Sequence, residues 1–303
     1  MKRWLIVVLA LAVLVAGLVG WGIWMVRKRP LEVFAMMGRQ GLKRAGLARM
    51  VVGAPCGPQA VWVGGKGPVV VLLHGAGDSA ATWAQIAPKL VVGHRLIAPD
   101  LAGHGQSAPE AGPIDIRMIL EGVEAGLDRL APGEPVTVVG NSLGAWVAML
   151  VTHRHPERVA RLVCVAGGAI SGHNENAMIL PRNREEARKG VAQARDAASA
   201  PVPDFVLDAI VREAQHGPLS RLAASANSMG GWLLDGRLGE IKAPVHLIWG
   251  ASDQIMPLDY ARRLQVELPS ATLVTIDHCG HVPQVECPGR FLAALQDALT
   301  EKR

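Results

Sequence analysis

The chain has 303 residues, of which 50% are hydrophobic and 19% are charged. This composition excludes a disordered chain and gives enough length for one large domain, or two modest ones, with a buried core. The net charge is +5, but residues 1–30 carry five bases and no acid, and residues 31–50 carry four bases and one acid. Subtracting these from the 31 bases and 26 acids of the whole chain leaves 22 bases and 25 acids, so the rest of the chain gives no support for nucleic-acid binding.

The N-terminus contains an uncharged run of 23 residues, Trp4 to Val26. A helix rises about 1.5 Å per residue, so this run is long enough to cross a hydrocarbon core about 30 Å thick. Tryptophans lie near both of its edges, where their rings favour the headgroup level, and the basic sequence Arg27-Lys28-Arg29-Pro30 follows it. Residues 1–30 are therefore predicted to form a single-pass transmembrane anchor.

A cleaved signal peptide is the alternative, because Lys2-Arg3 precede the apolar run and Ala10-Leu11-Ala12 resembles a cleavage site. The anchor is preferred because the run continues for 14 residues past Ala12. The side of the membrane stays open. The basic flank after the helix favours a cytoplasmic catalytic domain, whereas the short tail before a signal-like run favours the opposite side.

Residues 31–55 are interpreted as a basic juxtamembrane segment with an imperfect helical stripe over residues 31–50. The segment either lies on the membrane surface near anionic lipid or serves as a linker.

From about residue 60, short apolar runs bounded by Gly or Pro alternate with longer amphipathic stretches. The continuous run Val69–Leu73 is typical of a strand covered on both faces. The predicted strands are 69–73, 95–98, 136–139, 159–165, 245–249 and 272–276. The predicted helices are 79–92, 114–130, 142–153, 258–267 and 289–299. This alternation predicts an α/β fold with a mostly parallel sheet and helices on both faces.

About 80 residues between Val165 and Val245 interrupt the alternation, with helical patterns at 183–200 and 203–215 and no convincing strand. An insertion of this kind is expected to form a helical cap over the strand ends. The predicted organisation is a core of residues 56–167 and 241–303, with a cap of residues 168–240.

The sequence Gly140-Asn141-Ser142-Leu143-Gly144 lies directly after a predicted strand and directly before a predicted helix. This is the setting of a G-x-S-x-G nucleophile elbow, in which the glycines allow a tight turn that projects Ser142 from the backbone. The N-terminus of the following helix would favour a developing oxyanion. Ser142 is therefore the predicted nucleophile.

A serine nucleophile needs a base, and the base needs an acid that orients it. His281 is the candidate base because it lies in a glycine-containing loop after the last predicted strand, whereas its rival His278 abuts the strand end. Asp253, in the loop after the preceding strand, is the candidate acid, with Glu175 as a weaker alternative. The order Ser142, Asp253, His281 is the order found in α/β-hydrolases.

The oxyanion would be held by two backbone N–H groups, those of Ala76 and Leu143. Ala76 follows His74-Gly75 at the end of a predicted strand, and Leu143 follows the nucleophile. His74 and His104 are interpreted as structural hydrogen-bonding residues rather than catalysts.

Five segments together resemble the α/β-hydrolase superfamily over about residues 60–300: HGAGDSAATW, APDLAGHGQS, GNSLGAW, LIWGASDQIMP and CGHVPQVECP. The resemblance implies the α/β-hydrolase fold, a Ser142–Asp253–His281 triad and an oxyanion hole at Ala76 and Leu143. The anchor, the C-G-H turn and the cap also look like those of membrane-anchored monoacylglycerol lipases and bacterial membrane phospholipases. This closer likeness implies hydrolysis of fatty-acid esters, such as monoacylglycerols or lysophospholipids.

The predicted partners are an ester substrate and the lipid bilayer, a homodimer is left open, and neither a cofactor nor a metal is expected. Cleavage of C–C bonds, amides or thioesters by the same triad remains an alternative, as does a non-catalytic binding module. The four cysteines have no metal-ligand spacing. A Cys279–Cys287 bridge would require an oxidising compartment and is not favoured from the sequence.

Overall fold

One sheet forms the centre of the protein in the computed structural model, which describes residues 2–172, 180–268 and 270–300. Its strands are β1 (Ala48–Ala54), β2 (Gly57–Gly64), β3 (Val69–Leu73), β4 (Arg95–Pro99), β5 (Val136–Asn141), β6 (Val159–Val165), β7 (Val245–Gly250) and β8 (Ala271–Ile276). They are arranged in the order β1-β2-β4-β3-β5-β6-β7-β8. From β4 to β8 in this order, each strand, β3 included, pairs in parallel with the next, whereas β2 is antiparallel to β1 and to β4. The predicted mostly parallel sheet is confirmed.

The hairpin of β1 and β2 was not among the predicted strands, and β1 lies in the segment interpreted as juxtamembrane. Only one of its seven residues, Val52, is buried, so β1 lacks the alternation of apolar and polar residues that marks a half-buried strand. The hairpin turn uses Gly57, whose φ of 108° is unfavourable for other residues. The sheet therefore begins upstream of the predicted boundary at residue 56.

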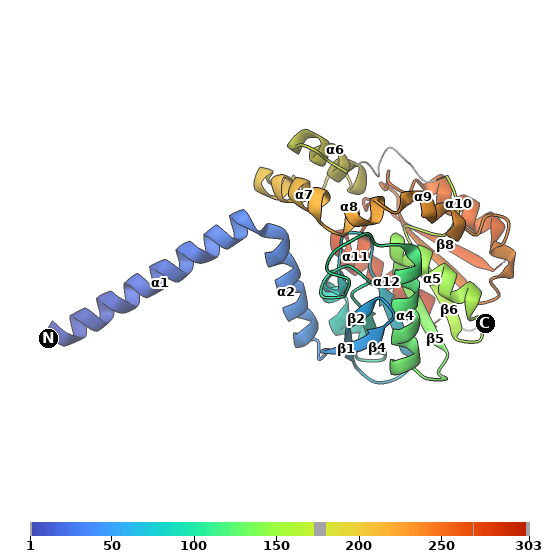
Figure 1. The fold of residues 1–303 in the computed structure, drawn as a ribbon, viewed down its shortest axis with the longest axis horizontal. Helices are drawn as coiled ribbons and strands as arrows, with labels where there is room; N and C mark the ends of the chain where they lie inside the picture. The colour runs from blue at the N-terminus through green and yellow to red at the C-terminus, as the bar shows by residue number, and fades with distance from the viewer. Residues whose placement is uncertain (1, 173–179, 269, 301–303) are drawn as a thin grey trace.

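Helices cover both faces of the sheet (Figure 1). One hydrophobic cluster packs β3, β5 and β6 side chains against α4 (Ile116–Leu130), α5 (Leu143–Arg154) and α10 (Leu258–Glu267). The opposite cluster includes α2 (Pro30–Arg44), the 3₁₀ helix η1 (Ala80–Gln85), α3 (Ala87–Leu90) and α12 (Pro288–Thr300). Val69 and Val71 belong to the first cluster and Val70 and Leu72 to the second, because successive side chains of a strand point to opposite faces.

The single helix predicted over residues 79–92 is two short helices, η1 and α3. Pro88 lies at the first turn of α3, where its missing N–H costs no hydrogen bond, and it cannot continue a helix from η1. The short helix α11 (Pro283–Glu286) was also not predicted.

The insertion between β6 and β7 is helical where it is described. Its elements are α6 (Arg184–Ala194), α7 (Asp204–His216), α8 (Pro218–Ala223), α9 (Ala226–Met229), η3 (Gly230–Trp232) and η4 (Leu238–Glu240). Arg221 of α8 fastens this cap to the core by donating to the carbonyl oxygens of Gly103, Pro109 and Gly112. The cap therefore packs firmly on the loop that follows β4.

The N-terminal helix α1 (Lys2–Lys28) extends away from the body as a long rod, and α2 turns back against the body (Figure 1). The span Val7–Lys28 of α1 is long and apolar enough to cross a membrane, with a mean hydropathy of 2.4 over its apolar 18-residue window and none of that window buried by the rest of the protein. A helix of this kind near the N-terminus is compatible with an anchor and with a signal sequence.

Helix α2 packs on η1 through two glycines. A Cβ atom on Gly38 would lie 2.7 Å from the Ala81 Cβ, and one on Gly41 would lie 3.0 Å from the Ala84 Cβ. The absence of side chains at Gly38 and Gly41 allows this close approach. The segment interpreted as a membrane-surface helix or a linker is thus in part a helix packed on the core.

Candidate active site

Ser142 occupies the sharp turn between β5 and α5, with φ 54° and ψ −117°. This backbone conformation is strained for a residue with a Cβ. Two residues before and two residues after Ser142, the backbone leaves room only for glycine. A Cβ on Gly140 would lie 2.1 Å from the Gly144 carbonyl oxygen, and a Cβ on Gly144 would lie 2.3 Å from the Leu73 carbonyl oxygen. The strand, turn and helix predicted for a nucleophile elbow are all present.

His281 and Asp253 form a hydrogen-bonded pair below the surface. The His281 Nδ1 lies 2.8 Å from the Asp253 Oδ2, and the two residues are 7% and 4% exposed. The other carboxylate oxygen, Oδ1, accepts from the backbone N–H groups of Ile255 and Met256, each at 2.9 Å. Because Nδ1 donates to a carboxylate, the Nε2 of a neutral His281 carries a lone pair, as a general base requires.

Asn141 joins the elbow to the loop that carries His281. Its Nδ2 donates to the carbonyl oxygens of His281, at 3.0 Å, and of Val165, at 3.1 Å, and its Oδ1 accepts from the Gln284 Nε2 at 3.0 Å. Asn141 and Gln284 are both buried. The residue before Ser142 is therefore bonded to the backbone of His281, which brings the elbow and the His281–Asp253 pair together at the carboxyl ends of the strands.

The predicted oxyanion donors lie on the two segments that meet at Ser142. A Cβ on Gly75 would lie 3.4 Å from the Ser142 Cβ, so the loop that contains Ala76 runs directly past the nucleophile. Leu143 is the first residue of α5. In the next part of the same loop, Gly77 has a φ of 74° and faces Leu219 of the cap.

Comparison of the sequence with models of protein families agrees with these observations. The model of the alpha/beta hydrolase family matches residues 70–295. The chain belongs to this family. The pimeloyl-[acyl-carrier protein] methyl ester esterase of Aromatoleum aromaticum is 30% identical over 255 residues, covering 77% of this chain and 98% of the relative. The 2-hydroxy-6-oxo-6-phenylhexa-2,4-dienoate hydrolase of Burkholderia cepacia is 27% identical over 251 residues, covering 75% of this chain and 86% of the relative.

Solved structures of similar fold include a membrane phospholipase A described as a bacterial virulence factor. It superposes with a TM-score of 0.74 at 24% identity, covering 99% of this chain and 98% of that chain. A putative lipase of Acinetobacter baumannii also has a TM-score of 0.74, at 21% identity, covering 89% and 97% of the two chains. At these identities the likeness shows that this hydrolase has their fold.

Two buried histidines of this hydrolase support the loops around the site. The His74 Nδ1 donates to the Gly75 carbonyl oxygen and its Nε2 accepts from the Leu101 N–H, while the His104 Nδ1 donates to the Ala102 carbonyl oxygen. Burial lowers the pKa of His74 to about 4 and that of His104 to about 3, so both rings are neutral at neutral pH. The structure places both histidines in the structural roles predicted for them.

Asp78 lies in the loop of the predicted oxyanion donor. Its carboxylate accepts from the Ser79 N–H at 2.8 Å. Desolvation is the largest influence on this group and raises its pKa to about 6.

The rival base His278 is not placed to pair with Asp253. His278 is 81% exposed at its side chain, and its Nδ1 lies 3.8 Å from a carboxylate oxygen of Asp196 rather than near Asp253. Glu175, the weaker acid candidate, lies outside the described residues.

Cys279 and Cys287 form a disulfide, contrary to the expectation from the sequence. Their Cα atoms are 6.1 Å apart because the chain turns through the short helix α11 between them. Cys56 and Cys164 are free thiols. The disulfide closes the loop that contains His281.

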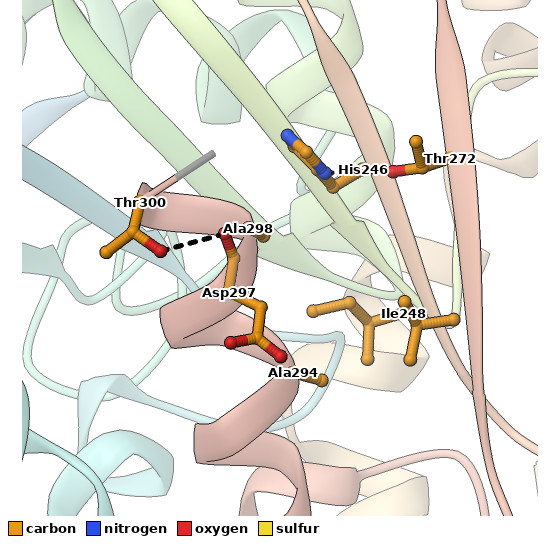
Figure 2. Close-up of a pocket in the computed structure, with 8 residues that line it drawn as sticks. His246, Ile248, Thr272, Ala294, Asp297, Ala298 and Thr300 are labelled. Atoms are coloured by element: carbon orange, nitrogen blue, oxygen red, sulfur yellow. Dashed lines mark hydrogen bonds between the residues drawn. The ribbon is translucent and has the colours of Figure 1, made fainter. Parts of the chain in front are cut away.

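A cavity of about 360 Å³ lies between β7, β8 and α12 (Figure 2). His246 and Ile248 line it from β7, Thr272 and Val274 from β8, and Asp297 from α12. The Thr272 hydroxyl lies 2.9 Å from the His246 Nδ1. His246 stands near the start of β7, whereas Asp253 follows the end of that strand, so this cavity is separate from the candidate active site.

Proposed function

We propose that this chain is a membrane-anchored serine hydrolase that cleaves carboxylic esters of lipids through an acyl-enzyme on Ser142. The observation that carries the proposal is the buried pair of His281 and Asp253 bonded, through Asn141, to the turn that bears the serine. A strained serine between two required glycines is the arrangement expected of an exposed nucleophile.

In the proposed reaction, the His281 Nε2 accepts the proton of the Ser142 hydroxyl while its oxygen attacks the ester carbonyl carbon. The backbone N–H groups of Ala76 and Leu143 stabilise the oxyanion. The imidazolium then protonates the leaving alcohol, and Asp253 stabilises the positive charge while it lasts. Water attacks the acyl-enzyme by the same route and releases the carboxylic acid.

The lipid substrate is supported by the arrangement of the N-terminal helices. The cap helix α7 contacts both α1 and α2, and the Arg212 guanidinium donates to the Lys28 carbonyl oxygen at the end of α1. If α1 crosses the bilayer, this contact holds the cap at headgroup level. The likeness in fold to a membrane phospholipase A over 99% of this chain is consistent with such a placement.

The disulfide supports a catalytic domain on the non-cytoplasmic side of the membrane. Disulfides persist in oxidising compartments and are rare where thiols are kept reduced. This argument favours the orientation indicated by the short N-terminal tail over the one indicated by the basic flank.

The test is ester hydrolysis by the detergent-purified full chain across a series of acyl-chain lengths that includes a monoacylglycerol and a lysophospholipid. We expect activity that rises with chain length and is lost in Ser142→Ala, with the fold retained. Activity confined to short esters would reject the lipid substrate, and activity retained in Ser142→Ala would reject the nucleophile.

A second candidate is hydrolysis of a C–C bond in a dienoate, because a relative named as a 2-hydroxy-6-oxo-6-phenylhexa-2,4-dienoate hydrolase covers 75% of this chain. The same triad can serve both reactions. Loss of the absorbance of such a dienoate on incubation with the protein, with no hydrolysis of any ester, would favour this candidate.

A further inference from the structure

Glu286 lies at the end of the loop closed by the disulfide, one residue before Cys287. Its side chain is 8% exposed. Its Oε2 accepts from the Gly280 N–H at 2.6 Å, and its Oε1 accepts from the Asp196 N–H at 2.9 Å and from the Ser199 hydroxyl at 2.5 Å. The Arg195 Nε lies 3.9 Å from the same Oε1. A nearly buried carboxylate is thus surrounded by hydrogen-bond donors.

These donors come from two parts of the molecule. Gly280 immediately precedes His281, whereas Asp196 and Ser199 belong to the cap segment that follows α6. The end of α6, just before this segment, contacts the catalytic loop directly, because the Ala194 carbonyl oxygen accepts from the His281 N–H at 2.8 Å. A Cβ on Gly280 would lie 2.2 Å from that oxygen, so the two backbones pack too closely for a side chain at this position. Glu286 therefore bridges the cap and the backbone of His281.

We propose that Glu286 is a positioning residue that holds His281 in register with Ser142 by fixing the cap segment and the catalytic loop to each other. The proposal rests on the proposed function only in taking His281 as the base for Ser142. Both oxygens of Glu286 receive donors, and only a carboxylate supplies two acceptors without a donor of its own. In Glu286→Gln the amide NH₂ would face either the Gly280 N–H or the donors of the cap, so one side of the bridge is lost.

A small displacement of a catalytic base has a large effect, since a misplacement of about 1 Å can cost about 100-fold in rate. We expect Glu286→Gln to lower kcat by about 10-fold to 100-fold, with KM within about twofold of the parent value. The rate at which a fluorophosphonate labels Ser142 should fall in step with kcat, because both reactions need the base in place. A loss of this kind at an unchanged KM and with the fold retained is a result that a purely structural role would not produce.

The experiment uses the detergent-purified full chain, a short p-nitrophenyl ester for the kinetics and a fluorophosphonate probe for the labelling rate of Ser142. Ser199→Ala removes only the hydroxyl on the cap side, and we expect it to lower kcat by about threefold with the fold intact. Glu134→Gln is the matched control, because Glu134 is half-exposed and pairs with Arg95 away from the site. We expect parent values for this control.

The proposal is overturned if Glu286→Gln keeps both kcat and the rate of fluorophosphonate labelling within twofold of the parent values. If Glu286→Gln does not fold, Ser199→Ala decides, and parent kinetics in that variant would overturn the proposal. If the probe labels Ser142 of the parent enzyme but the enzyme hydrolyses no lipid ester, only the lipid substrate is refuted. The role of Glu286 can still be tested then, because the labelling rates of the variants can be compared. Absence of labelling at Ser142 would refute both proposals.

Discussion

Asp253→Asn tests the catalytic assignment because the structure fixes how the new amide would be oriented. The Asp253 Oδ1 accepts from the N–H groups of Ile255 and Met256 at 2.9 Å each. An asparagine would keep its carbonyl oxygen on these two donors, since turning the amide would set its NH₂ against both of them. The NH₂ group then points at the His281 Nδ1, where the carboxylate oxygen Oδ2 now accepts.

An N–H donor at that position forces the His281 Nδ1 to accept, so the proton of the neutral ring moves to Nε2. A protonated Nε2 cannot take the proton of Ser142. Changing the tautomer in a serine triad lowers kcat by about 10⁴-fold. Since each tenfold in rate is 1.36 kcal/mol, this is an increase of about 5.4 kcal/mol in the activation free energy.

The assay compares kcat for a p-nitrophenyl ester and the rate of fluorophosphonate labelling between the parent, Asp253→Asn and Asp259→Asn. Asp259 provides the matched control because its side chain is 86% exposed and pairs with Arg262 on the surface of α10. We expect parent rates for the control and near-UV circular dichroism like that of the parent for both variants. A folded Asp253→Asn enzyme with kcat within tenfold of the parent value would refute the assignment of Asp253 and His281.

Three further predictions concern the buried histidines, the disulfide and the elbow. Because the pKa of His104 is about 3 in the folded protein and 6.5 when unfolded, the unfolded chain binds more protons between these values. Its contribution to stability is present above pH 6.5 and is lost as the pH falls towards 3, by about 2 kcal/mol at pH 5. His104→Gln should remove this contribution, which is measured as the change in the free energy of urea unfolding between pH 7 and pH 5. The same change in parent and variant would contradict the burial argument. His74 and Asp78 titrate in both proteins, so their effects cancel in the comparison. When protein from intact cells is unfolded and treated with a maleimide, only the two free thiols should be modified before reduction, and all four cysteines after it. Modification of four cysteines before reduction would place the domain in a reducing compartment. Gly144→Ala should destabilise the fold by about 1–3 kcal/mol and lower activity, because its Cβ would lie 2.3 Å from the Leu73 carbonyl oxygen; unchanged urea unfolding would show that the elbow has room.

The parts of the fold that could be predicted from the sequence are those whose neighbours are near in the chain or impose a pattern. All five residues of β3 are buried, so the strand appears as an unbroken apolar run. Ser142 is recognisable because a strand, a turn with two glycines and a helix follow one another within a short stretch. By contrast, β1 lies at the edge of the sheet and shows mostly exposed residues, so it carries no such pattern.

The contacts that hold the site together depend on residues far apart in the sequence, and for that reason the sequence did not reveal them. The bond from Asn141 to the His281 carbonyl oxygen spans 140 residues, and the bond from Ser199 to Glu286 spans 87. Asn141 could have been noticed as the polar residue before the nucleophile. Glu286 carries no local signal, because an isolated glutamate beside a cysteine is most often an exposed surface residue.

The same connections relate the N-terminal helix α1 to the candidate site in space. Gly38 and Gly41 of α2 fix the segment after α1 on η1, which follows the loop of the predicted oxyanion donor Ala76. Arg212 of α7 fixes the end of α1 to the cap, and Glu286 fixes another part of the cap to the loop of His281. Helix α1 is therefore joined to both sides of the candidate site, to the loop of Ala76 through α2 and to the loop of His281 through the cap. In the proposed membrane enzyme, the orientation of the site relative to the bilayer then follows from the packing of α2 and α7, so a loosened contact at either helix should affect lipid substrates more than soluble esters.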